Sequence, residues 1–309
     1  MKPALRVPLM LGLLVILFVV GQAILPGFIG SSQIANQLKI AAFLGLFGLC
    51  QTIVMTAGGQ GLDLSVGAVA TLGGVVGTAV LGDTGMTAVA MICAALAGLL
   101  AGLFNGVGIA LMGIPPLVAT LAVASVIDGG LILGVSELHP ANAASPLLIS
   151  LSGLTSAGIP NIVMLWIVVA VVAFWLIKSG WGRRLSATGS NPVTAYLSGT
   201  DTTRVKIVAY MLSGGLAGFT GILLTGYVSQ AFLGLGNPYI LTSVVVAAIG
   251  GVALEGGRAP YLGVICAAIL MTVLISLLTA LQMAEAGRQI VLGLTLLAFL
   301  LFDRVLKRA

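Results

Sequence analysis

Long apolar runs separated by short polar segments dominate the pattern of the chain. A helix that crosses a bilayer needs about 20 apolar residues, and eight runs are good candidates. They are Val7–Ile29, Leu38–Ala57, Thr87–Met112, Pro115–Val135, Asn161–Ile177, Ile207–Gln230, Tyr261–Leu281 and Gln289–Phe302. Two further runs, Ala68–Leu81 and Ile240–Leu254, are short, and we expect them to be tilted, broken or re-entrant. The pattern predicts an all-α integral membrane protein, a bundle of about ten spans (eight to ten), with residues 1–309 forming a single transmembrane domain.

Composition and the placement of charge agree with this pattern. Hydrophobic residues make up 59% of the chain and charged residues only 7%, with a mean hydropathy of +1.21. Soluble domains carry about 25% charged residues, so most of this surface must face lipid. Three segments hold most of the basic residues: Lys2 and Arg6 before the first span; Lys178, Arg183, Arg184, Arg204 and Lys206 between the sixth and seventh; Arg304, Lys307 and Arg308 after the last. Such clustering predicts that all three segments and both termini are cytoplasmic, and it argues for topology rather than nucleic-acid binding. The loop Glu137–Pro160 has no Lys or Arg, which fits the opposite side.

The first apolar run, Val7–Leu25, follows two basic residues and resembles a signal peptide. Because the rest of the chain is equally hydrophobic, we expect it to be a retained span.

Few residues are suited to bond chemistry or to energy conversion. The three cysteines, Cys50, Cys93 and Cys266, lie in apolar runs and are expected to be small buried hydrophobes, and His139 is too isolated for a metal site. None of the five lysines follows a glycine, so the chain lacks the G-x-x-x-x-G-K pattern of an ATPase. An autonomous carrier or channel remains an alternative, although few ionisable residues lie within spans. An integral membrane enzyme would need a cluster of His, Cys or carboxylates that the pattern does not show.

Two glycine-rich stretches are expected to serve helix packing. Residues 96–108 read LAGLLAGLFNGVG and residues 213–221 read SGGLAGFTG, with small residues at helical spacing. Small residues allow helix backbones to approach closely where lipid gives no hydrophobic drive for association. Close packing is therefore favoured over a nucleotide-binding glycine loop.

The segment 178–206 is the longest polar connection and contains the marks of a short helix at NPVTAYLSG. Asn191 can cap the first free amides, and Pro192 suits the first helical position, where its missing N–H costs nothing. Gly199 can adopt the left-handed conformation that ends a helix.

A helix of about two turns is not stable alone in water, so something must pack on it. Val193, Tyr196 and Leu197 would provide an apolar side, facing either the rest of the chain or a partner. The alternative is a solvated connection with an incidental turn. Arg183 and Arg184 flank the helix, or they anchor the membrane interface.

A single carboxylate stands in the stretch GGQGLDLSVG, residues 58–67. The glycines are expected to break the helix that ends near Ala57, and Asp63 precedes a helix that begins near Leu64–Ser65. There its carboxylate can accept hydrogen bonds from free helix amides and benefit from the helix dipole. A direct role in solute binding is the second interpretation, since broken helices form transport sites in several folds.

Three motifs together resemble the permease subunit of ribose-type ATP-binding cassette (ABC) sugar importers, along nearly the whole chain. GLDLSVG (61–67) resembles the family's G-[IL]-D-L-S-V-G signature, and NGVGIALMGIPPLVATL (105–121) resembles its N-G run followed by I-P-P and T-L. GRRLSATGSNPVTAYLSG (182–199) is similar to the family's cytoplasmic segment.

The resemblance implies separate ATPase subunits that bind ATP and Mg, with no cofactor in this chain itself. It also implies a second permease, a periplasmic binding protein and a location in the bacterial inner membrane, surrounded by lipid. The solute would be a monosaccharide or similar small polar molecule; a permease for branched-chain amino acids is the alternative within the class. Within the coupling loop 178–206, the residues expected to contact the ATPase are Gly182, Arg183, Gly189, Asn191, Pro192, Ala195, Ser198 and Gly199. Residues expected at the translocation path or helix break are Gly61, Asp63, Ser65, Asn105, Pro115, Pro116 and Asp128.

Two departures from the family pattern concern the path. The family often carries an Arg-Gly pair where this chain has Asp128, and its glycine pair before the D-L-S-V-G motif is Gln60-Gly61 here. A change in the sign of charge within a span alters the substrate or marks one half of an unlike pair of permeases. The second permease is therefore identical or unlike.

Overall fold

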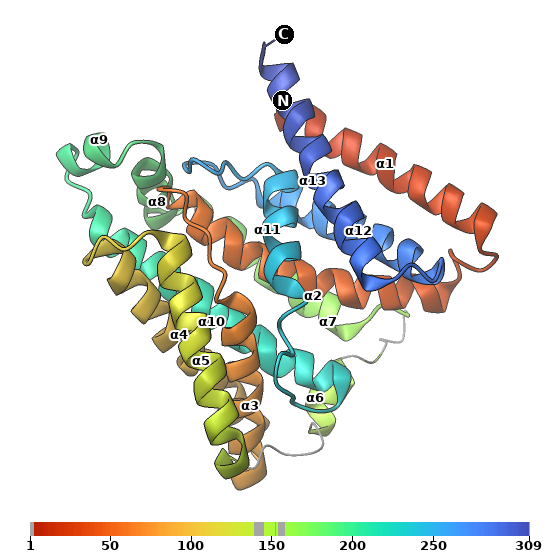
Figure 1. Ribbon diagram of the computed structural model, residues 1–309, viewed down its shortest axis with the longest axis horizontal. Helices are drawn as coiled ribbons and strands as arrows, with labels where there is room; N and C mark the ends of the chain where they lie inside the picture. The colour runs from red at the N-terminus through yellow and green to blue at the C-terminus, as the bar shows by residue number, and fades with distance from the viewer. Residues whose placement is uncertain (1–2, 139–144, 152, 154–157, 309) are drawn as a thin grey trace.

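The computed structural model describes residues 3–138, 145–151, 153 and 158–308. These residues form helices and no β-strand. In chain order the helices are α1 (Pro3–Ile24), α2 (Ser31–Thr56), α3 (Val66–Thr84), α4 (Thr87–Ala110), α5 (Pro116–Leu138), α6 (Pro146–Leu151), α7 (Asn161–Lys178), α8 (Gly180–Ser190), α9 (Pro192–Leu197), α10 (Thr202–Val228), α11 (Tyr239–Gly250), α12 (Tyr261–Ala280) and α13 (Glu285–Arg308). The predicted fold class, all-α, is confirmed (Figure 1).

Seven helices of the described part are long and apolar enough to cross a membrane. These are α1, α2, α4, α5, α7, α10 and α12. The two short runs also form helices: α3 has 19 residues and is longer than the sequence indicated, whereas α11 has only 12. The prediction missed α6 and α8. Part of the predicted loop 137–160, including His139, lies outside the described residues.

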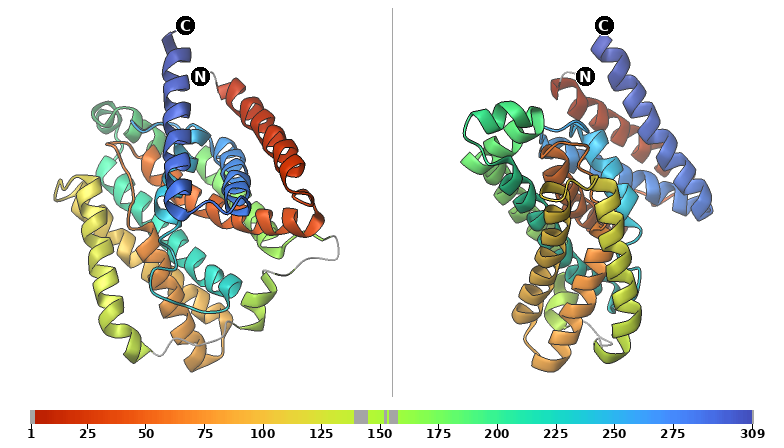
Figure 2. Two further views of the ribbon diagram at one scale, coloured as in Figure 1. Left: turned by 45° about the vertical axis from the view of Figure 1, so that its right-hand side comes forward. Right: turned by 60° about the vertical axis from the view of Figure 1, so that its left-hand side comes forward.

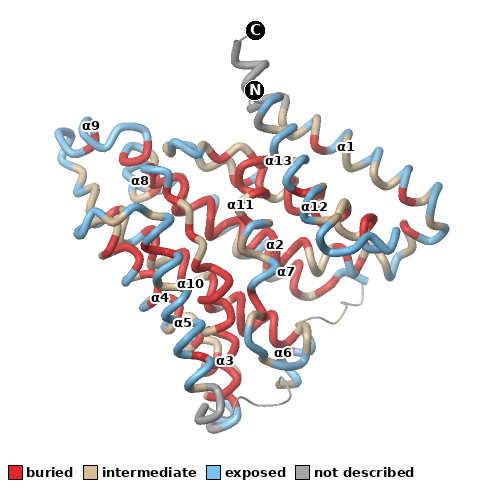
Figure 3. The backbone as a smooth tube through the Cα atoms, viewed as in Figure 1, coloured by how far each residue is buried: buried red, intermediate tan, exposed pale blue. Residues whose placement is uncertain are grey.

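Helix α2 forms the centre of the molecule and packs against α7, α10, α11 and α12. Its second half is buried without interruption from Ala41 to Thr56, as the red core in Figure 3 shows. By contrast, α1 and α5 carry many exposed apolar side chains, including Val19 and Leu133. A helix that is apolar and exposed is at home in lipid or against another chain, so this surface fits a membrane protein.

Helices α4 and α10 contact each other through glycine. A Cβ atom added to Gly98 would collide with the carbonyl oxygen of Gly214, and one added to Gly214 would collide with that of Gly98. The two stretches in which small residues were expected to serve helix packing, 96–108 and 213–221, thus face each other. Because the two backbones are in direct contact at these glycines, no side chain fits between them.

Both ends of the chain lie at the same end of the molecule as α8 and α9 (Figures 1 and 2). The short helix α6 and the far ends of α3 and α5 lie at the opposite end. The segments in which basic residues concentrate are therefore near one end of the bundle, which is the arrangement that the charge pattern requires.

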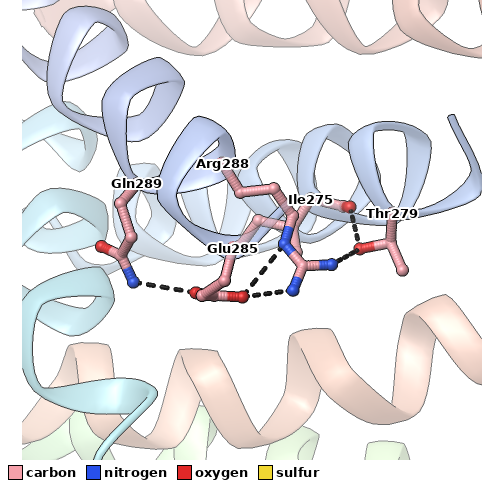
Figure 4. A network of polar contacts seen from close by, with 5 residues as sticks. All are labelled: Ile275, Thr279, Glu285, Arg288 and Gln289. Atoms are coloured by element: carbon pink, nitrogen blue, oxygen red, sulfur yellow. Dashed lines mark hydrogen bonds and ion pairs between the residues drawn. The ribbon is translucent and has the colours of Figure 1, made fainter. Parts of the chain in front are cut away.

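A polar network fastens the turn between α12 and α13 (Figure 4). Arg288 forms an ion pair with Glu285 and donates a hydrogen bond to Thr279 Oγ1 at 2.8 Å. Gln289 Nε2 donates to Glu285 Oε1 at 3.0 Å. These hydrogen bonds hold the pKa of the Glu285 carboxyl below its ordinary value, and the one from Arg288 has the largest effect. Because both partners lie within one turn of Glu285, the network fixes the start of α13.

The glycine contact between α4 and α10 gives a test of the fold. Replacing Gly98→Leu should separate the two helices and lower the free energy of unfolding by about 1–3 kcal/mol, the usual cost of overpacking. The measurement is the thermal midpoint of the purified protein in detergent. Gly12→Leu on α1, where nothing lies within 4 Å of the added atom, is the control. Equal midpoints for both variants would show that α4 and α10 do not approach as described.

Candidate functional site

The helix break after α2 is built from three consecutive left-handed residues. Gly58, Gly59 and Gln60 have φ values of 80°, 67° and 56°, a region that favours glycine. Gly61 follows and is buried so tightly that an added Cβ would lie 2.6 Å from the carbonyl oxygen of Val54. The chain therefore turns back under the end of α2 before α3 begins at Val66. The expected break is present.

Asp63 lies directly after this break and is 1% exposed. Its Oδ1 accepts hydrogen bonds from the backbone N–H of Ser65 at 3.0 Å and from the Ser65 hydroxyl at 2.6 Å. Its Oδ2 accepts one from the hydroxyl of Ser213 on α10 at 3.2 Å. All three donors are neutral, and they occupy both carboxylate oxygens.

The structure corrects how Asp63 serves the helix. It was expected to accept from free amides of α3 itself, but α3 begins one to two residues later than predicted, and Ser65 is its N-cap. Asp63 instead forms a local turn by bonding the amide two residues on, a conformation that Asp favours. This turn positions Ser65 at the start of α3. The carboxylate thus stands one to two positions further from the helix than expected.

The polar network continues into α2 and α4. Gln51 Nε2 donates to the Asp63 carbonyl oxygen at 2.6 Å, and Gln51 Oε1 accepts from the Asp63 N–H at 3.3 Å. Asn105 Nδ2 donates to the Ser65 hydroxyl at 2.7 Å. Four separate segments thus meet around Asp63 and Ser65. The sequence reasoning included Asp63, Ser65 and Asn105 but missed Gln51 and Ser213, although a glutamine in the middle of an apolar run was a usable signal.

Two buried polar atoms at this network have no hydrogen-bond partner among the described residues. They are Oδ1 of Asn105 and the hydroxyl of Tyr210 on α10. Tyr210 lies three residues before Ser213 on α10, about one helical turn away. Buried polar groups are almost always paired in proteins, so this region has unused hydrogen-bonding capacity that water or solute oxygens can satisfy.

The remaining residues expected at the path lie apart from Asp63. Pro115 is exposed in the turn before α5, and Pro116 is the first residue of that helix, a position that proline favours. Asp128 lies on α5 and is exposed, beside the exposed Gly129 and Gly130. The predicted residues therefore divide into a buried cluster and an exposed face of α5.

The polar segment 178–206 contains a helix that the sequence reasoning missed. Helix α8 begins after Ser179, whose side chain accepts a hydrogen bond from the N–H of Gly182. Gly182 is buried, whereas Arg183 is exposed and donates to the Lys178 carbonyl oxygen at 3.1 Å. The sequence did not indicate this helix because Gly180, Gly182 and Gly189 lower the helix propensity of the segment. Burial of Leu185 against the bundle compensates for that weak propensity.

The short helix expected at 191–199 is confirmed as α9, and its ends are formed as predicted. Asn191 Oδ1 accepts from the N–H of Thr194 at 3.0 Å, and Pro192 is the first helical residue. Gly199, with φ 82°, ends the helix: its N–H donates to the Tyr196 carbonyl oxygen and that of Thr200 to the Ala195 carbonyl oxygen. This pair of bonds is the Schellman motif.

Most of the apolar side of α9 is left uncovered. Val193, Tyr196 and Leu197 are 67%, 69% and 80% exposed, and Figure 3 shows α9 as exposed. Ala195 is buried, and Ser198 donates its hydroxyl to the Thr194 carbonyl oxygen. The sequence left two possibilities for what packs on this side of the helix, the rest of the chain or a partner. The rest of the described chain does not cover these three side chains.

The end of α8 contacts the break after α2 at a junction of bare backbone. An added Cβ at Gly189 would collide with the Thr56 carbonyl oxygen, and one at Gly58 would lie 2.6 Å from the Gly189 Cα. Gly256 approaches the same point, and the Gly257 N–H donates to the Thr56 carbonyl oxygen at 3.0 Å. We call these five residues the glycine junction. It joins the exposed α8–α9 segment directly to the segment that leads to Asp63.

The described residues contain no group of three His, Cys, Asp or Glu side chains that could hold a metal ion. The three cysteines are free. Cys50 is buried as expected, but Cys93 and Cys266 are only half-buried.

Comparison with known proteins gives a consistent family. A family described as branched-chain amino acid transport system / permease component matches residues 33–300. The autoinducer 2 import system permease protein LsrC of Shigella flexneri is 30% identical over 301 residues, covering 93% of this chain and 84% of the relative, and that of Escherichia coli strain K12 / DH10B gives the same values. The LsrC protein of Salmonella choleraesuis strain SC-B67 is 30% identical over 296 residues, covering 93% and 83%. No solved structure matches the chain.

The buried carboxylate gives a prediction about stability. Asp63→Asn keeps an oxygen for Ser65 and places an amide near the Ser213 hydroxyl, so the free energy of unfolding should change little. Asp63→Ala leaves the buried donors without an acceptor and should cost about 1–3 kcal/mol. Thermal or denaturant unfolding of the purified variants measures the difference. If the alanine variant is as stable as the asparagine variant, the carboxylate does not hold this site together.

Proposed function

This chain belongs to the permease component family of branched-chain amino acid transport systems, and it is a membrane permease subunit of an ATP-binding cassette importer; we propose that α9 is its docking helix for the ATPase. The resemblance inferred from the sequence motifs is thereby confirmed at the level of the family. The observation that carries the docking proposal is the uncovered apolar side of α9, on a helix whose two ends are both fixed by specific caps.

The coupling site comprises α8, α9 and the glycine junction. A partner that binds α9 pushes or pulls α8, and α8 contacts the α2 break with no side chains between them. Close-packed backbone transmits displacement because there is no soft side chain to absorb it. Gly182, Arg183, Gly189, Asn191, Pro192, Ala195, Ser198 and Gly199 belong to this site, in which Gly189 contacts the bundle and Asn191, Pro192 and Gly199 shape the helix.

The energy source is a separate subunit that binds ATP and Mg. The chain has no phosphate-binding lysine motif of its own, and it performs transport without bond chemistry. A periplasmic binding protein delivers the solute to the opposite end of the bundle. The proposed membrane is the bacterial inner membrane, with about ten spans and both termini cytoplasmic. The common location of the termini and α8–α9 at one end of the molecule supports that orientation.

The proposed solute is a monosaccharide or a similar small polar molecule. The relatives are named for import of autoinducer 2, and the GLDLSVG motif resembles sugar permeases. Buried oxygen and nitrogen atoms around Asp63, including the unpaired Asn105 Oδ1, are suited to hydroxyl-rich solutes or to the water that accompanies them. The family description names branched-chain amino acids, and that solute class is the alternative.

A second permease covers the exposed face of α5. Asp128 is exposed there beside the exposed Ile132, one turn further along the helix, and a carboxylate facing lipid is costly. We assign this face to the interface with the second permease, identical or unlike, where Asp128 faces a water-filled path. Pro115 and Pro116, which form the turn at the start of α5, set the position of the helix in that interface.

The docking proposal predicts the effect of making α9 polar. Replacing Val193, Tyr196 and Leu197 together by Ser should leave the permease folded, since all three side chains are exposed. The co-purifying ATPase and ATP-dependent uptake should both be lost, while the amount of permease in the membrane stays constant. Leu233→Ser, which changes an exposed apolar residue in the loop between α10 and α11, is the control. Undiminished ATPase recovery with the triple variant would refute docking at α9.

The path proposal predicts water at Asp128. In a permease whose native cysteines are replaced by Ala, the Asp128→Cys variant should react with a charged, membrane-impermeant maleimide, because only hydrated thiols ionise readily. Val171→Cys on the exposed apolar side of α7 should not react. The assay is labelling in vesicles that contain the assembled complex. An unreactive Asp128→Cys variant would place this face of α5 in lipid or in a dry interface.

A further inference from the structure

A groove of about 160 Å³ lies between α7 and α10, with α2 as its floor and α8 at one end. Helix α7 and helix α10 each pack on α2. The side chains that line the groove come from all four helices and from Ala259: Leu49, Thr52, Ile53, Thr56, Val169, Val172, Ala173, Leu176, Ile177, Trp181, Leu185, Leu212 and Leu216. The groove is separate from the cluster around Asp63, none of whose residues lines it.

The lining is chemically unsuited to a polar solute. The described residues that line the groove include no charged side chain, and the two hydroxyls in its floor already donate hydrogen bonds. Thr52 Oγ1 donates to the Gly48 carbonyl oxygen at 2.7 Å, and Thr56 Oγ1 donates to the Thr52 carbonyl oxygen at 2.6 Å. A ligand that fills this groove therefore has to be apolar along most of its length.

One donor at the α8 end of the groove is unused. Trp181 lines the groove, and its indole nitrogen is buried without a hydrogen-bond partner in the described part of the chain. A buried Trp N–H usually has a partner, and this nitrogen donates only, so its missing partner is an acceptor oxygen. The same end of the groove is therefore the place where an otherwise apolar ligand would carry its oxygen atoms.

Positive charge gathers beside that end. Lys178 is the last residue of α7 and follows the lining residue Ile177, whereas Arg183 and Arg184 lie on α8 between the lining residues Trp181 and Leu185. Arg183 and Arg184 are exposed, and the Lys178 ammonium lies 4.1 Å from the centre of the Phe174 ring. An apolar groove that ends at basic side chains matches a ligand with an apolar tail and an anionic head.

We propose that this groove binds an anionic phospholipid. One acyl chain lies along α2 between α7 and α10, an ester or phosphate oxygen accepts the Trp181 N–H, and the head group contacts the basic residues at the α7–α8 turn. Basic pockets between membrane helices on the cytoplasmic side are known to select anionic lipids, and the proposed orientation puts this end in the cytoplasmic leaflet. Because Thr56 and Leu185 both line the groove, the lipid would pack between the α2 break and α8, next to the glycine junction.

The test uses a photoactivatable phospholipid with a diazirine on its acyl chain. The permease, with the subunits that co-purify with it, is reconstituted in vesicles of phosphatidylcholine that contain the probe with either a phosphatidylglycerol or a phosphatidylcholine head group. After illumination, mass spectrometry identifies the labelled peptides. We expect label on the lining residues of α2, α7 and α10, and more of it from the anionic probe.

Two variants and a matched control make the result specific. Ala173→Trp fills the groove and should abolish its label, whereas Val171→Trp, on the exposed side of the same helix and outside the lining, should leave it. Trp181→Phe keeps the ring but removes the N–H, and it should reduce labelling about twofold to tenfold, the effect of one hydrogen bond. If the Ala173→Trp variant does not fold, groove labelling of the Trp181→Phe variant tests the proposal.

Three outcomes would overturn the proposal. They are equal groove labelling by the two head groups, equal labelling of the groove and of the exposed side of α7, and full labelling of the Trp181→Phe variant. Cross-links from the lining residues to a second permease or to the ATPase would likewise show that a protein partner, and not a lipid, occupies the groove.

Discussion

A membrane-embedded backbone has to satisfy its own hydrogen bonds, and the break between α2 and α3 is where this chain meets that constraint most severely. Three left-handed residues end the helix, and the buried peptide groups on either side of them need hydrogen-bond partners within the protein. The Gly257 N–H bonds the Thr56 carbonyl oxygen, and Gln51 bonds both backbone groups of Asp63. The rest of the site follows from this arrangement, because each of these partners brings another helix or loop to the break.

The same requirement explains why the break and the α8–α9 segment form one unit. A side chain at Gly189 or Gly58 would separate α8 from α2 and remove the cover of the Thr56 carbonyl oxygen. The close backbone contact that covers the Thr56 carbonyl oxygen therefore also makes this region stiff. In a transporter driven from outside the chain, such stiffness is useful, since movement at α9 reaches the segment before Asp63 without loss in flexible side chains.

Sequence patterns predicted those features that depend on local chemistry. The apolar runs gave the helices, and the caps of α9 were predicted residue by residue, because Asn191, Pro192 and Gly199 act on their own neighbours along the chain. Features that depend on tertiary contact were missed. Helix α8 is rich in glycine and exists because Leu185 packs on the bundle. The partner of Asp63 on α10, Ser213, is 150 residues away in the sequence, and no local pattern links the two.

Asp63 and Asp128 show why one chain of this kind is incomplete. Both carboxylates stand among glycines and apolar residues in the sequence. Asp63 has three donors and is 1% exposed, so the chain itself meets the cost of burying it. Asp128 is exposed on α5 beside large apolar side chains, an environment that neither lipid nor this chain makes favourable. The apolar side of α9 is likewise exposed to an unfavourable environment, but there it is apolar side chains that face water. In the proposed assembly a second permease covers the first of these surfaces and an ATPase covers the second.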